Sequence, residues 1–91
     1  MNLKKYKTAE KEFDKAIAIN PNACGAIRNK GLCLSLAGKH KSGIKQINTA
    51  ISKCPDDYKT YATRGLAYYV AKKYDKAIRD YEKTVEIITI L

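Results

Sequence analysis

The sequence predicts an all-α fold in which antiparallel helix pairs stack side by side, and three observations predict it. Shifting the chain against itself by 34 residues superposes Pro21 on Pro55 and Gly31 on Gly65, with matches all along the register. Within each unit, apolar residues recur at intervals of three and four, which places them on one helix face. Proline and Asn or Asp clusters separate these segments. The pattern is typical of a stacked helical array.

Residues that end or cap helices set the predicted bounds of each helix. Pro21-Asn22 and Pro55-Asp56-Asp57 end one helix and supply Asn or Asp as a cap for the next. Residues 37–39 and 71–73 are expected to be the turns inside each pair. The predicted helices span residues 3–19, 23–37, 40–53, 57–71 and 74–89.

Each predicted helix has its own apolar face. The first carries a stripe whose counterparts recur twice at the same offset, and its members are Tyr6, Ala9, Phe13, Ala16 and Ile17. In the third and fifth helices the equivalent residues are Gly43, Ile47 and Ala50, then Ala77, Tyr81 and Thr84. In the second and fourth helices the stripes are Ile27, Gly31 and Leu34, then Tyr61, Gly65 and Tyr68. Small residues beside large ones predict a close approach of the helices.

Two glycines stand in the middle of predicted helices, where glycine costs about 1 kcal/mol relative to alanine. Gly31 and Gly65 lie at the centre of the apolar stripes. We therefore expect the facing helix to come so near that a methyl group would clash. A phosphate-binding role is disfavoured because each glycine lacks the strand and loop of a nucleotide-binding fingerprint.

The chain is strongly basic, with 18 Lys plus Arg against nine Asp plus Glu and a formal charge of +9. Such a charge attracts polyanions, acidic protein tails or anionic membranes, but the basic residues are spread along the chain as on a solvated surface. Seven tyrosines beside this charge leave nucleic-acid or other polyanion binding as an alternative function. Periodic packing explains most of the tyrosines and leaves Tyr58 and Tyr69 freer.

The cysteines and the histidine suggest neither catalysis nor a metal site. Cys24, Cys33 and Cys54 are odd in number and have no Cys-x-x-Cys spacing, so we expect reduced, buried cysteines and no disulfide or zinc. His40 aligns with tyrosines and is expected to pack. No grouping of nucleophile, base and acid is evident, so no catalytic residue, metal or cofactor is predicted, and the protein is expected not to be an enzyme.

The N-terminus has charge but no apolar core after it, so it does not resemble a secretory signal. No apolar run is long enough to span a membrane, because even residues 85–91 are short and include Glu86. A cytoplasmic location is therefore expected.

At these positions the sequence resembles the tetratricopeptide repeat family, whose pattern has a large apolar residue, a small one, a tyrosine, then alanine, an aromatic residue and proline. The resemblance covers nearly the whole chain. It implies one domain over residues 1–91, with the second helix of a partial repeat at 1–21, a full repeat at 22–55, and a full repeat with the C-terminal end at 56–91. Lys30 and Arg64 depart from the pattern because they occupy a place usually given to leucine, and Thr89 stands where proline is expected.

The resemblance implies a right-handed superhelix whose concave groove holds a peptide or a partner's helix, and no catalytic residues. A non-enzymatic scaffold or adaptor with a protein partner, which can be acidic, is the expected function. The residues on the groove side would be Arg28, Asn29, Leu32, Leu36, Lys59, Thr63, Leu66 and Tyr69. Chaperone-binding members use a carboxylate clamp for acidic C-terminal tails, and Asn29 and Lys59 match two of its positions, whereas Thr63 departs from the expected arginine.

The ends of the array are expected to be open, since a repeat cannot bury its own apolar face. The sequence begins with a second helix and ends on an apolar segment without a solvating helix. Either the chain is part of a longer array or its ends pair with another copy. We expect self-association through Val85, Ile87, Ile88 and Leu91.

Overall fold

The computed structural model describes residues 3–90, and these residues form five α-helices with no strand among them. The helices are α1 (Leu3–Ile19), α2 (Cys24–Leu36), α3 (His40–Lys53), α4 (Tyr58–Val70) and α5 (Tyr74–Ile90). Each predicted helix is confirmed, and no end differs from its prediction by more than one residue.

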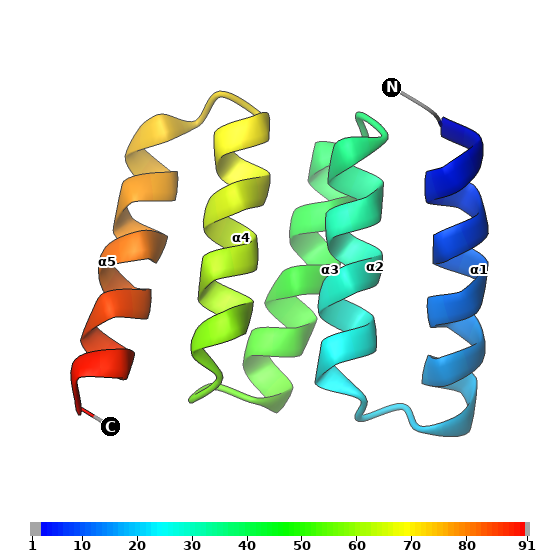
Figure 1. The fold of residues 1–91 in the computed structure, drawn as a ribbon, viewed down its shortest axis with the longest axis horizontal. Coiled ribbons are helices and arrows are strands. Elements are labelled where there is room, and N and C mark those ends of the chain that lie inside the picture. Colours follow the sequence, from blue (N-terminus) through cyan, green and yellow to red (C-terminus); the bar gives the residue numbers. More distant parts are fainter. Residues whose placement is uncertain (1–2, 91) are drawn as a thin grey trace.

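The helices form a thin slab of 36 × 30 × 16 Å (Figure 1). Helices α2 and α3 form one antiparallel pair, and α4 and α5 form the next. Helix α1 packs on α2, and α4 packs against both α2 and α3, which lies behind α2 in Figure 1. The predicted all-α helical-repeat fold is confirmed.

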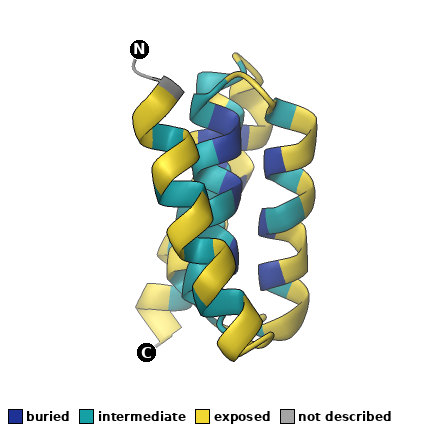
Figure 2. Cartoon of the chain, turned by 90° about the vertical axis from the view of Figure 1, so that its right-hand side faces the viewer, coloured by how far each residue is buried: buried dark blue, intermediate teal, exposed yellow. Residues whose placement is uncertain are grey.

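The core lies where the helices face one another (Figure 2). Its fully buried side chains include Ile47, Ala50 and Ala67, and Ile27 and Leu34 are nearly so. All of these except Ala67 belong to the predicted stripes. The stripe of α5 differs, because Ala77 is buried but Tyr81 is 39% exposed. The core is therefore best enclosed in the α2/α3 pair.

The two helix-centre glycines stand where the helices come closest, as predicted. A Cβ on Gly31 would lie 2.6 Å from Cγ1 of Ile47 and 2.7 Å from the backbone oxygen of Gly43. A Cβ on Gly65 would lie 2.8 Å from the ring of Tyr81. These distances are shorter than van der Waals contact, so the absent methyl group is what allows each approach.

Both turns inside the helix pairs have the same hydrogen-bonded geometry. In the first turn Gly38 has φ of 92°, and the amide of Lys39 donates to the carbonyl of Leu34. In the second turn Lys72 has φ of 64°, and the amide of Lys73 donates across the turn in the same way. This is the Schellman arrangement that closes a helix C-terminus, and its left-handed position favours glycine. Lys72 therefore occupies a conformation that is costly for a residue with a Cβ.

The predicted helix caps are confirmed at one of two sites. The carboxylate of Asp57 accepts a 3.0 Å hydrogen bond from the amide of Lys59 and caps α4. The prediction was wrong for Asn22, because the residue before α2 is Ala23, which provides no side-chain cap. The side-chain oxygen of Asn22 instead accepts a 3.0 Å hydrogen bond from Lys53 at the end of α3. That contact joins the segment before α2 to the C-terminus of α3.

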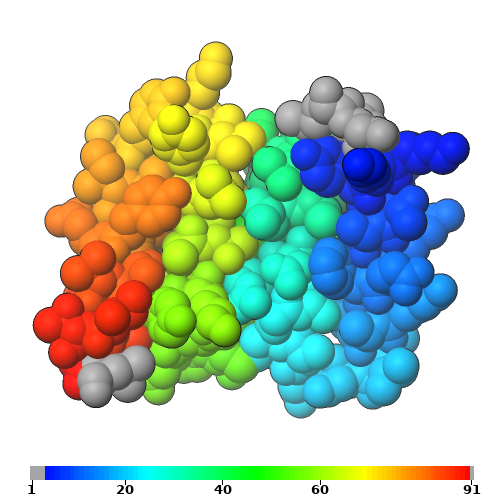
Figure 3. Space-filling view, in the orientation of Figure 1, coloured from blue at the N-terminus to red at the C-terminus, as the bar shows by residue number. Residues whose placement is uncertain are grey.

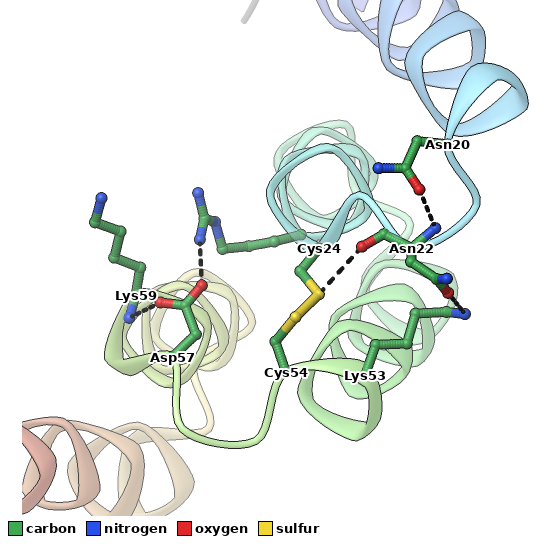
Figure 4. Close-up of a disulfide and its surroundings, with 8 residues drawn as sticks. Asn20, Asn22, Cys24, Lys53, Cys54, Asp57 and Lys59 are labelled. Carbon is green, nitrogen blue, oxygen red and sulfur yellow. Dashed lines mark hydrogen bonds and ion pairs between the residues drawn. A yellow bond between two sulfur atoms is a disulfide. The ribbon is translucent and has the colours of Figure 1, made fainter.

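Cys24 and Cys54 form a disulfide, so the prediction that they are reduced was wrong (Figure 4). Cys24 begins α2 and Cys54 follows α3, and their Cα atoms are 6.4 Å apart. In an antiparallel pair, residues at equal distances before and after the turn meet, and these two are equidistant from Lys39. The bond closes the open end of the α2/α3 pair, opposite the turn.

Candidate functional site

All eight residues predicted for the groove lie on α2 and α4. These two helices contact each other and run in the same direction at the centre of the face shown in Figure 3. Lys59, Leu66 and Tyr69 are exposed, and the other five are half-buried. We refer to this surface, formed by Arg28, Asn29, Leu32, Leu36, Lys59, Thr63, Leu66 and Tyr69, as the α2/α4 face.

The end of this face near the helix N-termini is basic. The guanidinium of Arg28 lies 3.4 Å from Oδ2 of Asp57, while the other oxygen of Asp57 accepts from the backbone of Lys59 (Figure 4). Asp57 thus holds α2 against the start of α4 and partly neutralises Arg28. The exposed Lys59 has no recorded ion pair within residues 3–90.

The other end of the face is apolar. Leu66 is 39% exposed and Tyr69 is 57% exposed. The ring of Tyr69 contacts that of Tyr74 edge to face, with the ring centroids 5.6 Å apart. Between the two ends, the hydroxyl of Thr63 donates to the carbonyl of Lys59 at 2.8 Å and so turns toward its own helix. An apolar side chain can bury area against Leu66 and Tyr69.

The chemistry of this face favours non-covalent binding of a polar and apolar segment. Asp57 already pairs with Arg28 and caps α4, so the exposed ammonium of Lys59 is the group at this end that can attract a carboxylate. Leucine and tyrosine side chains at the other end supply apolar contact area. The two kinds of contact lie along the same pair of helices.

One residue that the repeat pattern marked only as a departure holds three helices together. Arg64 of α4 donates two hydrogen bonds to the carboxylate of Asp80 on α5, at 2.7 and 2.9 Å. It donates a third, at 2.9 Å, to the side-chain oxygen of Asn48 on α3. Its hydrogen bond to Asp80, which is 4% exposed, raises the pKa of Arg64. The guanidinium also lies over the rings of two tyrosines on its own helix, Tyr61 and Tyr68.

Lys30, another departure from the repeat pattern, makes one equivalent contact a repeat earlier. Its ammonium lies 2.7 Å from the carboxylate of Asp14 on α1. Asp14 and Asn48 are 34 residues apart, as are Lys30 and Arg64. Sequence reasoning missed these contacts, although the recurrence of a basic residue at one repeat position and a polar acceptor at another was a signal.

The remaining candidate residues do not form a reactive centre in residues 3–90. Cys33 is half-buried, and burial, followed by the nearby Glu10, raises the pKa of its thiol, which disfavours the reactive thiolate. His40 is half-buried, and its Nδ1 has no hydrogen-bond partner there. No three His, Cys, Asp or Glu side chains of this part of the chain gather as a metal site would require. None of its helices is long and apolar enough to cross a membrane.

The residues predicted for oligomer contact lie toward the end of α5. Val85 and Ile88 are exposed and Ile87 is half-buried, while Leu91 lies outside the described residues. The exposed members continue an apolar stripe that begins with Tyr74 and Ile78. Val85 and Ile88 therefore belong to an exposed apolar surface that follows one side of α5.

Comparison with known proteins agrees with this architecture. Two models of the tetratricopeptide repeat match residues 1–23 and 58–88. The chain is 33% identical to Hsp70-Hsp90 organizing protein 3 of Arabidopsis thaliana, over 87% of this chain and 14% of that protein. It is 32% identical to small glutamine-rich tetratricopeptide repeat-containing protein 2 of Mycosarcoma maydis, over 96% of this chain and 25% of that protein. Among solved structures it resembles MamA, with a TM-score of 0.76 and 27% identity, over 93% of this chain and 50% of MamA. The chain thus spans a quarter or less of the length of the Arabidopsis thaliana and Mycosarcoma maydis proteins.

Proposed function

Because the chain belongs to the tetratricopeptide repeat family, we propose that it is a non-enzymatic adaptor that binds a segment of another protein on the α2/α4 face. The single observation that carries the proposal is the division of that face into a basic end and an apolar end. A segment with a carboxylate followed along its length by apolar side chains matches both ends.

The basic end determines the orientation of the bound segment. Lys59 is exposed, and Arg28 already shares Asp57, so Lys59 is the cation more available to a ligand. A charge-assisted hydrogen bond of this kind contributes about 1.5 kcal/mol or more. The apolar side chains of the ligand then lie toward Leu66 and Tyr69.

The name of one relative, Hsp70-Hsp90 organizing protein 3, suggests the first partners to try. We propose that the acidic C-terminal tails of Hsp70 and Hsp90 are ligands of the α2/α4 face. The amide of Asn29 and the ammonium of Lys59 provide two of the groups for such a tail, and Thr63 does not supply the arginine expected at its position.

The test is isothermal titration of the protein with peptides of these two tails and with scrambled versions. Lys59→Glu should weaken binding roughly tenfold, from the loss of about 1.5 kcal/mol. Tyr69→Ala should weaken it by a similar factor through lost apolar contact. Lys41→Glu, on an exposed position of α3, is the matched control with the same charge change.

Equal weakening by Lys41→Glu and Lys59→Glu would refute a specific face and favour the polyanion alternative. Titration with an oligonucleotide over a range of salt concentrations then measures that alternative directly. Unchanged binding in both Lys59→Glu and Tyr69→Ala would show that the ligand binds to a surface other than the α2/α4 face.

A further inference from the structure

The second helix of the last described repeat carries an apolar stripe that is partly exposed along its length. Its members, separated by four, three, four and three residues, are Tyr74, Ile78, Tyr81, Val85 and Ile88. Each is between 39 and 62% exposed. This spacing keeps the residues on one side of α5, as in a helix that packs against another helix. We call these five residues the α5 stripe.

The same stripe one repeat earlier is covered. The residues 34 positions before Tyr74, Ile78 and Tyr81 are buried or half-buried on α3, and the last of them, Ile47, is fully buried. Helix α4 packs against α3 at this place in the stack. Tyr81 and Tyr74 of the α5 stripe pack partly against α4, through Gly65 and Tyr69. The outer side of the stripe, with Ile78, Val85 and Ile88, has no helix on it within residues 3–90.

A polar contact accompanies this interface in both earlier repeats. Lys30 of α2 pairs with Asp14 of α1 at 2.7 Å, and Arg64 of α4 donates to Asn48 of α3 at 2.9 Å. In each case, a basic residue of the covering helix meets an oxygen of the covered helix. The third residue in the series that begins with Asp14 and Asn48 is Glu82, which is exposed on α5 beside the stripe.

The surroundings of Glu82 are acidic although the whole chain carries +9. Glu86 lies one turn further along α5 and Asp75 lies two turns before Glu82, with Lys76 and Arg79 between Asp75 and Glu82 in the sequence. Glu86 is shared with Lys83 at 3.7 Å, whereas no ion pair is recorded for Glu82 within residues 3–90. An apolar stripe with an acidic edge is complementary to a helix with apolar and basic residues.

We propose that the α5 stripe is a docking site for a helix of a partner protein, and that a Lys or Arg of this helix pairs with Glu82. The covering helices of this chain define the chemistry of the partner. Both carry a large apolar residue, a basic residue three positions later, glycine next, and a second large apolar residue three positions after the glycine. These residues are Ile27, Lys30, Gly31 and Leu34 in α2, and Tyr61, Arg64, Gly65 and Tyr68 in α4. The site lies on a different helix from Lys59, so it adds a second contact to the proposed adaptor.

A second copy of this chain fits the site less well than a partner helix. The two helices with the required pattern are packed within the stack, so a folded copy does not present either of them. A two-fold pairing of α5 stripes uses the same surface on both copies and brings two acidic edges together. The charge of the edge therefore favours a basic helix from another protein.

The probe for this site is a synthetic peptide of residues 56–73, which contains α4 with its basic residue and glycine. We expect the protein to bind this peptide in fluorescence anisotropy. Glu82→Arg in the protein should weaken binding roughly tenfold, as should Arg64→Glu in the peptide. The two changes together should restore most of the loss. Glu12→Arg, on the exposed side of α1, is the matched control and should leave binding unchanged.

Three results would overturn the proposal. Absence of rescue in the charge-swapped pair would remove Glu82 from the interface, and unchanged binding by Val85→Asp would place the peptide elsewhere. A dimer of the protein alone in sedimentation, dispersed by Val85→Asp, would assign the stripe to a second copy. Peptide binding to the α5 stripe and tail binding near Lys59 are measured with separate probes, so failure of one is distinct from failure of the other.

Discussion

Reduction of the Cys24–Cys54 disulfide should destabilise the protein more than any other mild treatment. The bond joins residues separated by 30 positions, so the reduced unfolded chain regains the freedom of a loop of that length. The loop-entropy relation gives about 3.7 kcal/mol at room temperature for a loop of roughly 30 residues. For a domain of this size, that corresponds to a fall in Tm of about 15–30 °C. We expect the native contacts of Cys24 to remain in the reduced protein, so the effect should come chiefly from the unfolded state.

The assay is urea unfolding followed by circular dichroism, with and without a phosphine reductant. Cys33→Ser serves as the control, because Cys33 is outside the bond and should leave the difference between the two conditions unchanged. Cys54→Ser without reductant should reproduce the reduced behaviour. A difference of less than about 1 kcal/mol between oxidised and reduced protein would contradict the loop-entropy argument.

Two further changes test the stack and its turns by the same unfolding assay. Arg64→Ala leaves the carboxylate of Asp80 buried without its partner and should cost about 3 kcal/mol, whereas Arg79→Ala on the exposed side of α5 should cost less than about 0.5 kcal/mol. Equal costs would show that the buried pair is not a stabilising contact. Lys72→Gly removes a Cβ from a left-handed turn position and should stabilise by about 0.5–1 kcal/mol. The same change at Lys73 should give no gain, and equal gains at both positions would disprove the assignment of strain to Lys72.

Most of the fold followed from the sequence because the repeat supplies the same information several times. Pro21 and Pro55 fix the spacing, and Gly31 and Gly65 fix the sides on which the helices meet. Each helix is therefore specified by its own apolar spacing and by its register with its counterparts. Local pattern and stacking agree, which is the condition for a sequence to specify one structure.

The contacts that escaped prediction depend on pairs of residues far apart in sequence. Cys24 and Cys54 meet only because α2 and α3 are antiparallel, and an odd cysteine count concealed the pair. The partners of Arg64 could not be identified from the sequence, because Asp80 and Asn48 come from two different helices, α5 and α3. The residues of the α2/α4 face were predicted from the sequence. The ion pair between Asp57 and Arg28 was not predicted, because it depends on a distance between two helices that the sequence alone does not give.

The two helix-centre glycines face different kinds of atoms, and this determines which repeat can accept a larger residue at that position. Gly31 faces backbone of Gly43, which cannot yield without moving a whole helix, whereas Gly65 faces a tyrosine ring that can rotate away. A library of altered repeats would therefore tolerate alanine or serine in the last unit and reject both in the middle one. Chimeras that insert extra units should copy the last repeat, since there the facing group is a side chain that can move and not backbone.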